Sequence, residues 1–200
     1  MKPRPDTDFP VHELIDKRWS PRAFSGRDIE LKDVMTLFEA ARWAASCNNQ
    51  QPWNFIFALK SDKKFYEQLT ECLMDGNKLW TQTAPMLILT VAKKTFDYKN
   101  KPNKYHYHDI GLAIGNLSIQ AASMNLYAHQ MAGFYPEKAR KICNIPENFD
   151  PVSMIAVGYL GNPNTLPQKL YDTEISAQKR KQLNEFVYNG EWGNNININK

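Results

Sequence analysis

The stretch 109–126 constrains the fold more than any other part of this chain, because it is apolar on almost every side. A helix of this character must be covered on most of its surface. In a chain of 200 residues, we expect it to lie at the centre of the domain or at an interface between subunits. Its apolar members are Ile110, Leu112, Ala113, Ile114, Leu117, Ile119, Ala121, Ala122 and Met124.

The remaining periodicities predict helices and strands without a regular β-α-β alternation. Such a mixture favours the α+β class over a parallel α/β sheet. Residues 127–133 fit either a strand or a loop. We expect helices at 11–17, 30–45, 62–74 and 136–143, and strands at 54–59, 85–93 and 152–159, with the strand at 85–93 in a central position.

The two ends of the chain differ from its centre. Residues 1–9 are predicted to be irregular. From Gly161 onward, prolines and scattered polar residues predict an extended arm over 161–200, with a short helical piece near 183–187. The arm has little apolar periodicity, so it must lie on another surface of its own chain or of a partner. We expect one domain over residues 1–200.

The composition is that of an ordinary globular chain, with 42% hydrophobic and 23% charged residues and a formal net charge of +4. This balance gives little reason to expect a nucleic acid as partner, and it suits an anionic ligand. The apolar run 84–92 is too short to span a bilayer, and the start of the chain shows no secretory signal. Three cysteines lack a Cys-x-x-Cys pair. We therefore expect a cytoplasmic protein without a membrane segment or a metal site.

Residues 46–53 read Ser-Cys-Asn-Asn-Gln-Gln-Pro-Trp and gather four side-chain amides in one bend. An amide offers both a donor and an acceptor. A row of amides therefore suits the edge of a planar ring that alternates C=O and N–H, as flavins and pyrimidines do. A polar turn ended by proline is the plainer interpretation, and this segment alone favours it.

A second polar segment lies upstream, where Arg18, Ser20 and Arg22 alternate. In extended backbone these three side chains face the same way. Arginine forks match phosphate oxygens, and a hydroxyl adds a further bond. The segment is therefore a candidate anion clamp, although a solvated basic patch beside Asp16 and Asp28 is the simpler explanation when it is taken alone.

Together, these segments resemble the nitroreductase family of FMN-dependent oxidoreductases. In that family an Arg-x-Ser-x-Arg/Lys-x-Phe segment, matched here by residues 18–24, precedes a Ser-rich Asn-x-Gln-Pro-Trp segment, matched by 49–53. Residues 130–134 look like the family's central loop beside the flavin ring. Residues 179–181 look like its C-terminal basic segment. The four matches follow the family's order and cover nearly the whole chain.

The chain departs from the family pattern at two positions. Ala45 stands where the family often has proline, and Gln182 stands where the basic segment commonly runs into proline. The second departure leaves open which cation of the segment 179–181 faces a phosphate. Arg180 is the first choice, Lys179 is the second, and Lys181 is the third member of the run.

The resemblance implies a mixed sheet packed by helices, in an intertwined homodimer with two FMN sites at the interface. It implies that Arg18, Ser20, Arg22 and Arg180 hold the phosphate, with Lys179 as the second choice in the basic run. It implies that Asn49 and Gln51 bond the ring edge or ribityl chain and that 130–133 line the ring. The cofactor-binding residues expected on this basis are Arg18, Trp19, Ser20, Arg22, Asn49, Gln51, Gln130, Met131, Ala132, Gly133, Lys179 and Arg180.

The activity implied by the resemblance is a ping-pong transfer of hydride from NADH or NADPH, through flavin N5, to a nitroaromatic or quinone. No catalytic side chain is expected, because the flavin carries the chemistry. The chain lacks Gly-x-Gly-x-x-Gly and Gly-x-Ser-x-Gly, which disfavours a Rossmann fold and a hydrolase. We interpret His106 and His108 as a solvated loop pair. Aromatic candidates for a substrate wall are Trp43, Phe96, Tyr105 and Tyr107.

Three alternatives stay open at this stage. The amide bend and the basic run 179–181 would also suit a module that binds nucleotides or RNA without redox chemistry. A protein could bind FMN without turnover. A flavin enzyme of the same fold could catalyse another reaction, such as reductive dehalogenation or flavin fragmentation.

Overall fold

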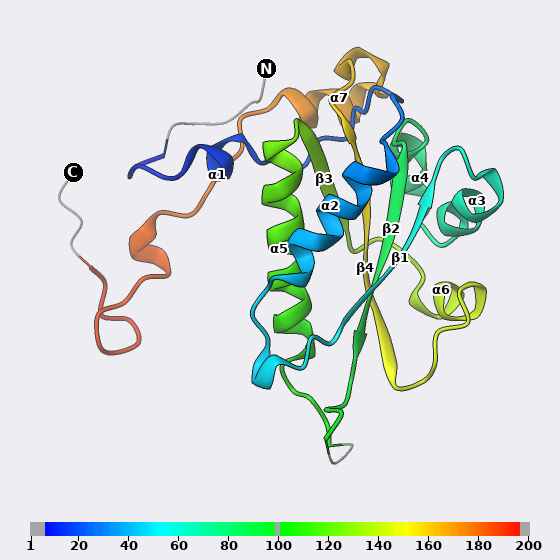
Figure 1. Cartoon of the computed structure of the whole chain (residues 1–200). Coiled ribbons are helices and arrows are strands. Elements are labelled where there is room, and N and C mark those ends of the chain that lie inside the picture. The colour runs from blue at the N-terminus through cyan, green and yellow to red at the C-terminus, as the bar shows by residue number, and fades with distance from the viewer. Residues whose placement is uncertain (1–6, 99–100, 197–200) are drawn as a thin grey trace.

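The computed structural model describes residues 7–98 and 101–196, and its centre is a four-stranded sheet covered by helices on both faces (Figure 1). This arrangement confirms the predicted α+β class. The strands are β1 (Trp53–Leu59), β2 (Met86–Lys93), β3 (Leu126–Met131) and β4 (Phe149–Tyr159). Their order is β1-β2-β4-β3, so β2 is central as predicted. We expected a mixed sheet, but all three pairings in the described part of the chain are antiparallel.

Two helices, α2 (Leu31–Arg42) and α5 (His106–Ser123), cover one face of the sheet (Figure 1). The buried side of α2 carries Val34, Leu37 and Ala41, which recur at helical spacing and are fully buried. The apolar helix predicted at 109–126 is therefore real, although β3 already begins at Leu126. Its position against the sheet explains why most of its surface is apolar.

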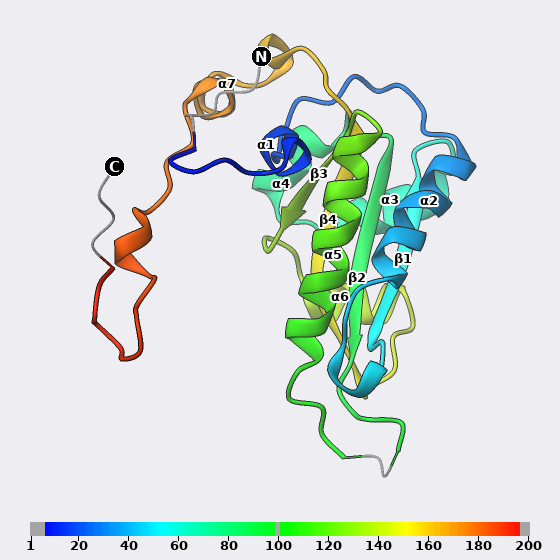
Figure 2. The same cartoon turned by 60° about the vertical axis from the view of Figure 1, so that its left-hand side comes forward.

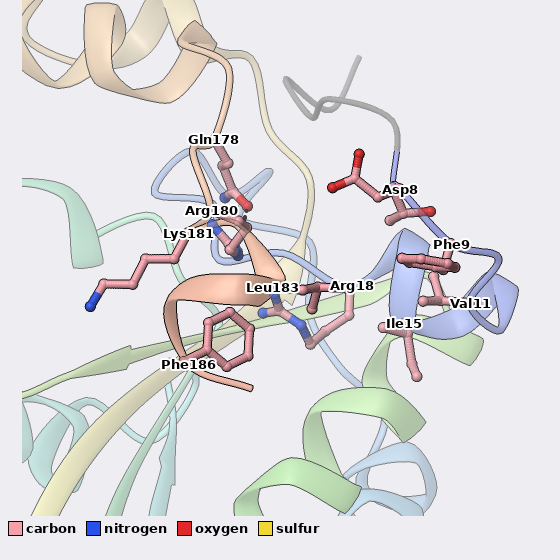
Figure 3. Close-up of a pocket in the computed structure, with 11 residues that line it drawn as sticks. Asp8, Phe9, Val11, Ile15, Arg18, Gln178, Arg180, Lys181, Leu183 and Phe186 are labelled. Carbon is pink, nitrogen blue, oxygen red and sulfur yellow. Dashed lines mark hydrogen bonds between the residues drawn. The ribbon is translucent and has the colours of Figure 1, made fainter. Parts of the chain in front are cut away.

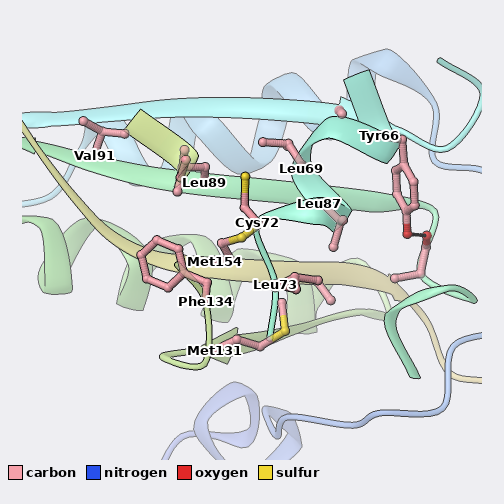
Figure 4. Packing of buried hydrophobic residues seen from close by; sticks show 14 of the residues in the cluster. Tyr66, Leu69, Cys72, Leu73, Leu87, Leu89, Val91, Met131, Phe134 and Met154 are labelled. Carbon is pink, nitrogen blue, oxygen red and sulfur yellow. Dashed lines mark hydrogen bonds between the residues drawn. The ribbon is translucent and has the colours of Figure 1, made fainter. Parts of the chain in front are cut away.

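The opposite face is covered by α3 (Lys63–Glu71), α4 (Asp75–Thr81) and α6 (Pro136–Ile142). Their side chains form a second core with the sheet, in which Cys72, Leu73 and Met154 are fully buried (Figure 4).

The helix predicted at 62–74 ends early, and α4 was not predicted. The reason is that the Met74 N–H donates to the Gly133 carbonyl at 3.0 Å, while Leu73 forms a β-bridge with Phe134. These tertiary bonds replace the helical ones and break the helix in two.

The segment after α1 (Glu13–Lys17) is attached to the C-terminal end of β4. The Ser25 N–H donates to the Tyr159 carbonyl at 3.0 Å, and the Gly161 N–H donates to the Ala23 carbonyl at 2.9 Å. A Cβ on Gly161 would lie 2.4 Å from the backbone of Phe24. Only glycine permits this close approach, and the approach fixes the arginine-bearing segment beside the sheet.

The C-terminal segment leaves the sheet after α7 (Gln168–Ile175), and residues 176–196 run away from the body (Figures 1 and 2). The expected helical piece near 183–187 is present as a 3-10 turn, Leu183–Glu185. The expectation that this arm is extended from residue 161 onward was wrong, because α7 interrupts it. The predicted irregular stretch 1–9 and the arm both reach beyond the described residues, which begin at 7 and end at 196.

None of the described helices is both long enough and apolar enough to cross a membrane.

Candidate functional site

Cations from the two ends of the sequence meet at one cavity of about 550 Å³ (Figure 3). Arg18 follows α1, and Arg180 and Lys181 come from the C-terminal arm. Lys179 does not line this cavity, and Lys181 takes its place. The lining residues are Thr7, Asp8, Phe9, Val11, Ile15, Arg18, Gln178, Arg180, Lys181, Leu183 and Phe186.

A second cavity of about 440 Å³ adjoins the first, since Gln178 lines both. Ser20 and Arg22 line it together with Gln130 from β3. The four residues predicted to hold a phosphate thus lie at two neighbouring cavities. Trp19 also borders the second cavity, but its side chain is buried and packs edge-on against Tyr127, with 6.3 Å between the ring centroids.

The stretch 18–24, called the arginine segment below, has its backbone held by two residues whose role the sequence did not predict. The Nδ1 atom of His129 donates to the Pro21 carbonyl at 2.9 Å. Burial lowers the pKa of His129 to about 4, so this imidazole is neutral near pH 7. The buried carboxylate of Glu174, on α7, accepts the N–H groups of Arg22 at 2.8 Å and Ala23 at 3.1 Å. The sequence offered no signal for Glu174, because α7 has no apolar stripe.

The segment 130–133 contributes less to the cavities than expected. Gln130 is exposed and lines the second cavity, and Ala132 is also exposed. The Met131 side chain points instead into the core formed with α3 and α6 (Figure 4). The Gly133 carbonyl accepts the Asn77 side-chain amide at 2.9 Å, and a Cβ on Gly133 would lie 2.7 Å from that nitrogen. Of these four residues, the structure brings only Gln130 to the cavities.

The amide bend has a strained backbone. Asn48, Asn49 and Gln51 have φ values of 52°, 54° and 47°, a region that residues other than glycine seldom adopt. The Ser46 hydroxyl stabilises this conformation, because it accepts the Gln51 N–H at 3.0 Å. The side chains of all three strained residues are exposed. Such strain concentrates at functional sites.

Three side-chain hydrogen bonds hold the bend in place. The Cys47 N–H donates to the buried carboxylate of Asp109 at 3.0 Å, in the first turn of α5. The Asn48 amide donates to the Tyr98 hydroxyl at 2.9 Å. The Gln50 side chain accepts the Asp97 N–H at 2.9 Å. Sequence reasoning missed Asp109, although a lone aspartate at the start of an otherwise apolar helix was a usable signal.

Within one chain, the bend and the arginine segment lie at opposite ends of α5. The bend contacts Asp109 in the first turn, whereas Lys17, next to Arg18, donates to the Asn125 side chain at 2.7 Å, just past the last turn. A helix of 18 residues is about 27 Å long at roughly 1.5 Å per residue. The structure therefore brings Arg18 and Arg180 together but separates them from Asn49 and Gln51.

The aromatic and histidine candidates are partly reassigned. Phe96 stacks on Tyr98 with 5.3 Å between the ring centroids, close to the bend. Trp43 is 74% exposed, and Tyr105 and Tyr107 are also exposed. The interpretation of His106 and His108 as a loop pair was wrong, because both lie in the first turn of α5. The reason is that the apolar pattern used to place this helix begins only after them. His106 is largely buried and bonds the Asn103 carbonyl at 2.6 Å.

Comparisons with known proteins agree with this architecture. A sequence model of the nitroreductase family matches residues 15–79 and 64–159. A solved structure described as an oxidoreductase containing FMN is 32% identical, with a TM-score of 0.89 over 94% of this chain and 95% of that chain.

Two curated relatives carry different names. A protein of Archaeoglobus fulgidus, provisionally named an NADH dehydrogenase/NAD(P)H nitroreductase, is 27% identical over 74% of this chain and 83% of its own length. An iodotyrosine deiodinase of Haliscomenobacter hydrossis is 26% identical over 74% of this chain and 78% of its own length. The family match covers well over half of the chain, so this protein belongs to the nitroreductase family and is an oxidoreductase.

Proposed function

We propose that this protein binds FMN in a homodimer and passes hydride from NADH or NADPH to a small electron-poor acceptor. The observation that carries the proposal is that Arg18 and Arg180, which lie far apart in the sequence, line one cavity. When bound, FMN supplies hydride transfer through its N5 atom. A similar structure, 32% identical, is described as containing FMN.

The donor chemistry of the site fits a flavin mononucleotide. Arg18, Arg22 and Arg180 are permanent cations that match phosphate oxygens, and the Ser20 hydroxyl adds a donor. The exposed amides of Asn49 and Gln51 carry donors and acceptors suited to the ring edge. Cations near a reduced, anionic ring would also stabilise it. This assignment leaves Met131 as a core residue and gives no phosphate contact to Lys179.

A homodimer is proposed because one chain cannot bring its own amide bend to its own cations. A second copy could place its bend at the arginine segment of the first. The exposed face of α5 supports this arrangement, since Gly111 and Gly115 have open space around them and Leu112 is 39% exposed. Apolar side chains beside the first cavity, including Phe9 and Phe186, are also about half exposed. A partner would cover these surfaces.

We further propose that the chain is a single domain and that it works in the cytoplasm, where its three cysteines would stay reduced. The reaction would be ping-pong, with NADH or NADPH leaving before the acceptor enters the same open face. A nitroaromatic or a quinone is the proposed acceptor class.

A spectrum of the purified protein tests the proposal. We expect a yellow protein with flavin absorbance that bleaches on addition of NADH or NADPH under nitrogen and returns when a quinone is added. A protein that stays colourless after incubation with FMN and gel filtration would contradict the proposal. A yellow protein that does not bleach would identify a flavin binder without turnover.

Replacing Arg18 and Arg22 by alanine should release FMN, because the phosphate would lose two cations. The matched control is Lys32→Ala with Lys104→Ala, which removes two exposed cations away from both cavities. The ratio of flavin to protein absorbance after gel filtration measures the effect. Full flavin occupancy in the double arginine variant would show that the clamp assignment is wrong.

Reductive dehalogenation is the second candidate reaction, and the deiodinase relative supports it. Both reactions would use the same flavin and the same proposed dimer. Anaerobic incubation of the reduced protein with iodotyrosine separates them, since release of iodide coupled to flavin reoxidation would favour dehalogenation.

A further inference from the structure

Glu174 is a buried acidic residue beside a cluster of cations that is proposed to bind an anion. Glu174 is 4% exposed, and it lines the second cavity together with Arg22. One carboxylate oxygen, Oε1, accepts the backbone N–H groups of Arg22 and Ala23. The other, Oε2, lies 3.9 Å from Nη1 of Arg22 and has no hydrogen-bond partner.

A buried carboxylate is unfavourable unless nearby donors and charges compensate it. Among the described residues, the compensation comes from the arginine segment, through two charge-assisted hydrogen bonds and one cation. The backbone at 21–23 is thereby held from two sides, since His129 bonds the Pro21 carbonyl. The contact also joins α7, at the root of the C-terminal arm, to the N-terminal segment.

The Arg22 side chain is 27% exposed, and Arg22 lines the second cavity. The other residues that line this cavity are uncharged near pH 7: His129 is neutral, and Ser20 and Gln130 carry no charge. Among the residues that line this cavity, Glu174 is the one anion, and its Oε2 lies within ion-pair distance of this guanidinium.

We propose that Glu174 is a positioning residue, which fixes the Arg22 backbone and aims its guanidinium at the phosphate of the bound flavin. The inference rests on the proposed function, which assigns Arg22 to that phosphate. Through this contact, α7 sets the geometry of the N-terminal cations while the arm that follows α7 supplies Arg180.

A double-mutant cycle between Glu174 and Arg22 tests the proposal, with FMN and riboflavin as paired ligands that differ only in the phosphate. Dissociation constants are measured by flavin fluorescence for the wild type, E174A, E174Q, R22A and the two double variants. Asp172→Asn is the matched control, because it changes the charge at an exposed position of the same helix.

We expect E174A to raise the FMN dissociation constant roughly tenfold, the scale of one charge-assisted hydrogen bond, and to leave riboflavin binding unchanged. E174Q should recover part of the loss, because its amide oxygen can still accept both backbone N–H groups. In the R22A background, neither substitution should weaken FMN further. The control should bind like the wild type.

Equal losses with and without Arg22, or unchanged FMN binding in both Glu174 variants, would overturn the proposal. If E174A does not fold, E174Q alone decides between the outcomes. The proposal then requires that E174Q weakens FMN binding in the wild type and has no further effect on FMN binding in the R22A background. A wild type that binds no FMN would overturn the proposed function as well. If the wild type binds FMN and R22A weakens it while E174Q and E174A do not, only the present inference fails.

Discussion

At the scale of single residues, the site depends on groups that hold other groups in place. Asn48, Asn49 and Gln51 adopt positive φ values, each at a cost of the order of 1–3 kcal/mol. The buried carboxylate of Asp109 and the Ser46 hydroxyl hold this conformation through backbone N–H groups. Glu174 does the same for the arginine segment by accepting the Arg22 N–H, and His129 holds that segment by donating to the Pro21 carbonyl. Buried and half-buried side chains thus hold the backbone that carries the exposed ones.

His129 predicts a loss of stability in acid. Burial lowers its pKa from 6.5 to about 4 in the folded protein. Between these values the unfolded chain binds a proton that the folded chain does not, so the free energy of unfolding falls as the pH is lowered through this window. The contribution is about 3 kcal/mol.

Urea unfolding at pH 7 and pH 4.5 measures this effect. The variant H129N should be less dependent on pH than the wild type. The control H12N removes an exposed histidine at a helix cap that asparagine can also serve, and it should keep the wild-type dependence. Equal pH dependence in H129N and the wild type would contradict the assignment.

The sequence revealed the residues whose chemistry is carried by a local motif. Arg18, Ser20 and Arg22 alternate along the chain, which made them a candidate anion clamp, and the family resemblance added Arg180 from the basic run. Glu174 and Asp109 have no motif, because their partners are backbone N–H groups 62 to 152 positions away along the chain. Such bonds depend on tertiary structure and could not be predicted from local pattern.

At the scale of elements, α5 carries the clearest sign of a missing partner. Gly111 and Gly115 lie one turn apart on its exposed face, and a Cβ at either position would meet no atom of the described residues within 4 Å. Glycine in the middle of a helix costs about 1 kcal/mol relative to alanine. Close packing against a second helix would offset this cost.

Replacing Gly111 or Gly115 by leucine therefore distinguishes a monomer from a dimer packed through α5. In a dimer, either substitution should separate the two copies and lower the flavin content. Gly76→Leu is the matched control, since Gly76 is also an exposed helical glycine with open space around it. Light scattering after gel filtration reports the mass, and a dimer unchanged by both α5 substitutions would exclude packing at this face.

Elements with strong apolar periodicity were predicted from the sequence, and those with weak periodicity were not. Helices α2 and α5 and all four strands were located to within a few residues, with β3 left as strand or loop. Helix α7 was missed, because the only residue it buries is Glu174. Helix α3 was predicted to run on to residue 74 and α4 was not predicted, because the break between them depends on bonds to Gly133 and Phe134.

At the scale of the whole molecule, the proposed site is a property of two chains. One chain provides Arg18, Ser20, Arg22 and Arg180 at one end of α5, and its own amide bend lies at the other end of this helix, which is about 27 Å long. A flavin bound by both sets would require the bend of one copy and the cations of the other. Each dimer would then hold two sites, and each site would depend on both copies.

Complementation between two variants that each bind FMN poorly tests directly whether each site depends on both copies. One variant carries R18A and R22A, the other carries N49A and Q51A, and different affinity tags allow the mixed dimer to be purified after coexpression. Each variant alone should retain little FMN. The mixed dimer contains one intact site and one site that lacks both halves, so it should bind one FMN per two chains. A mixed dimer that retains no more FMN than its parents would contradict the account, because it would show that the cations and the bend must come from the same chain.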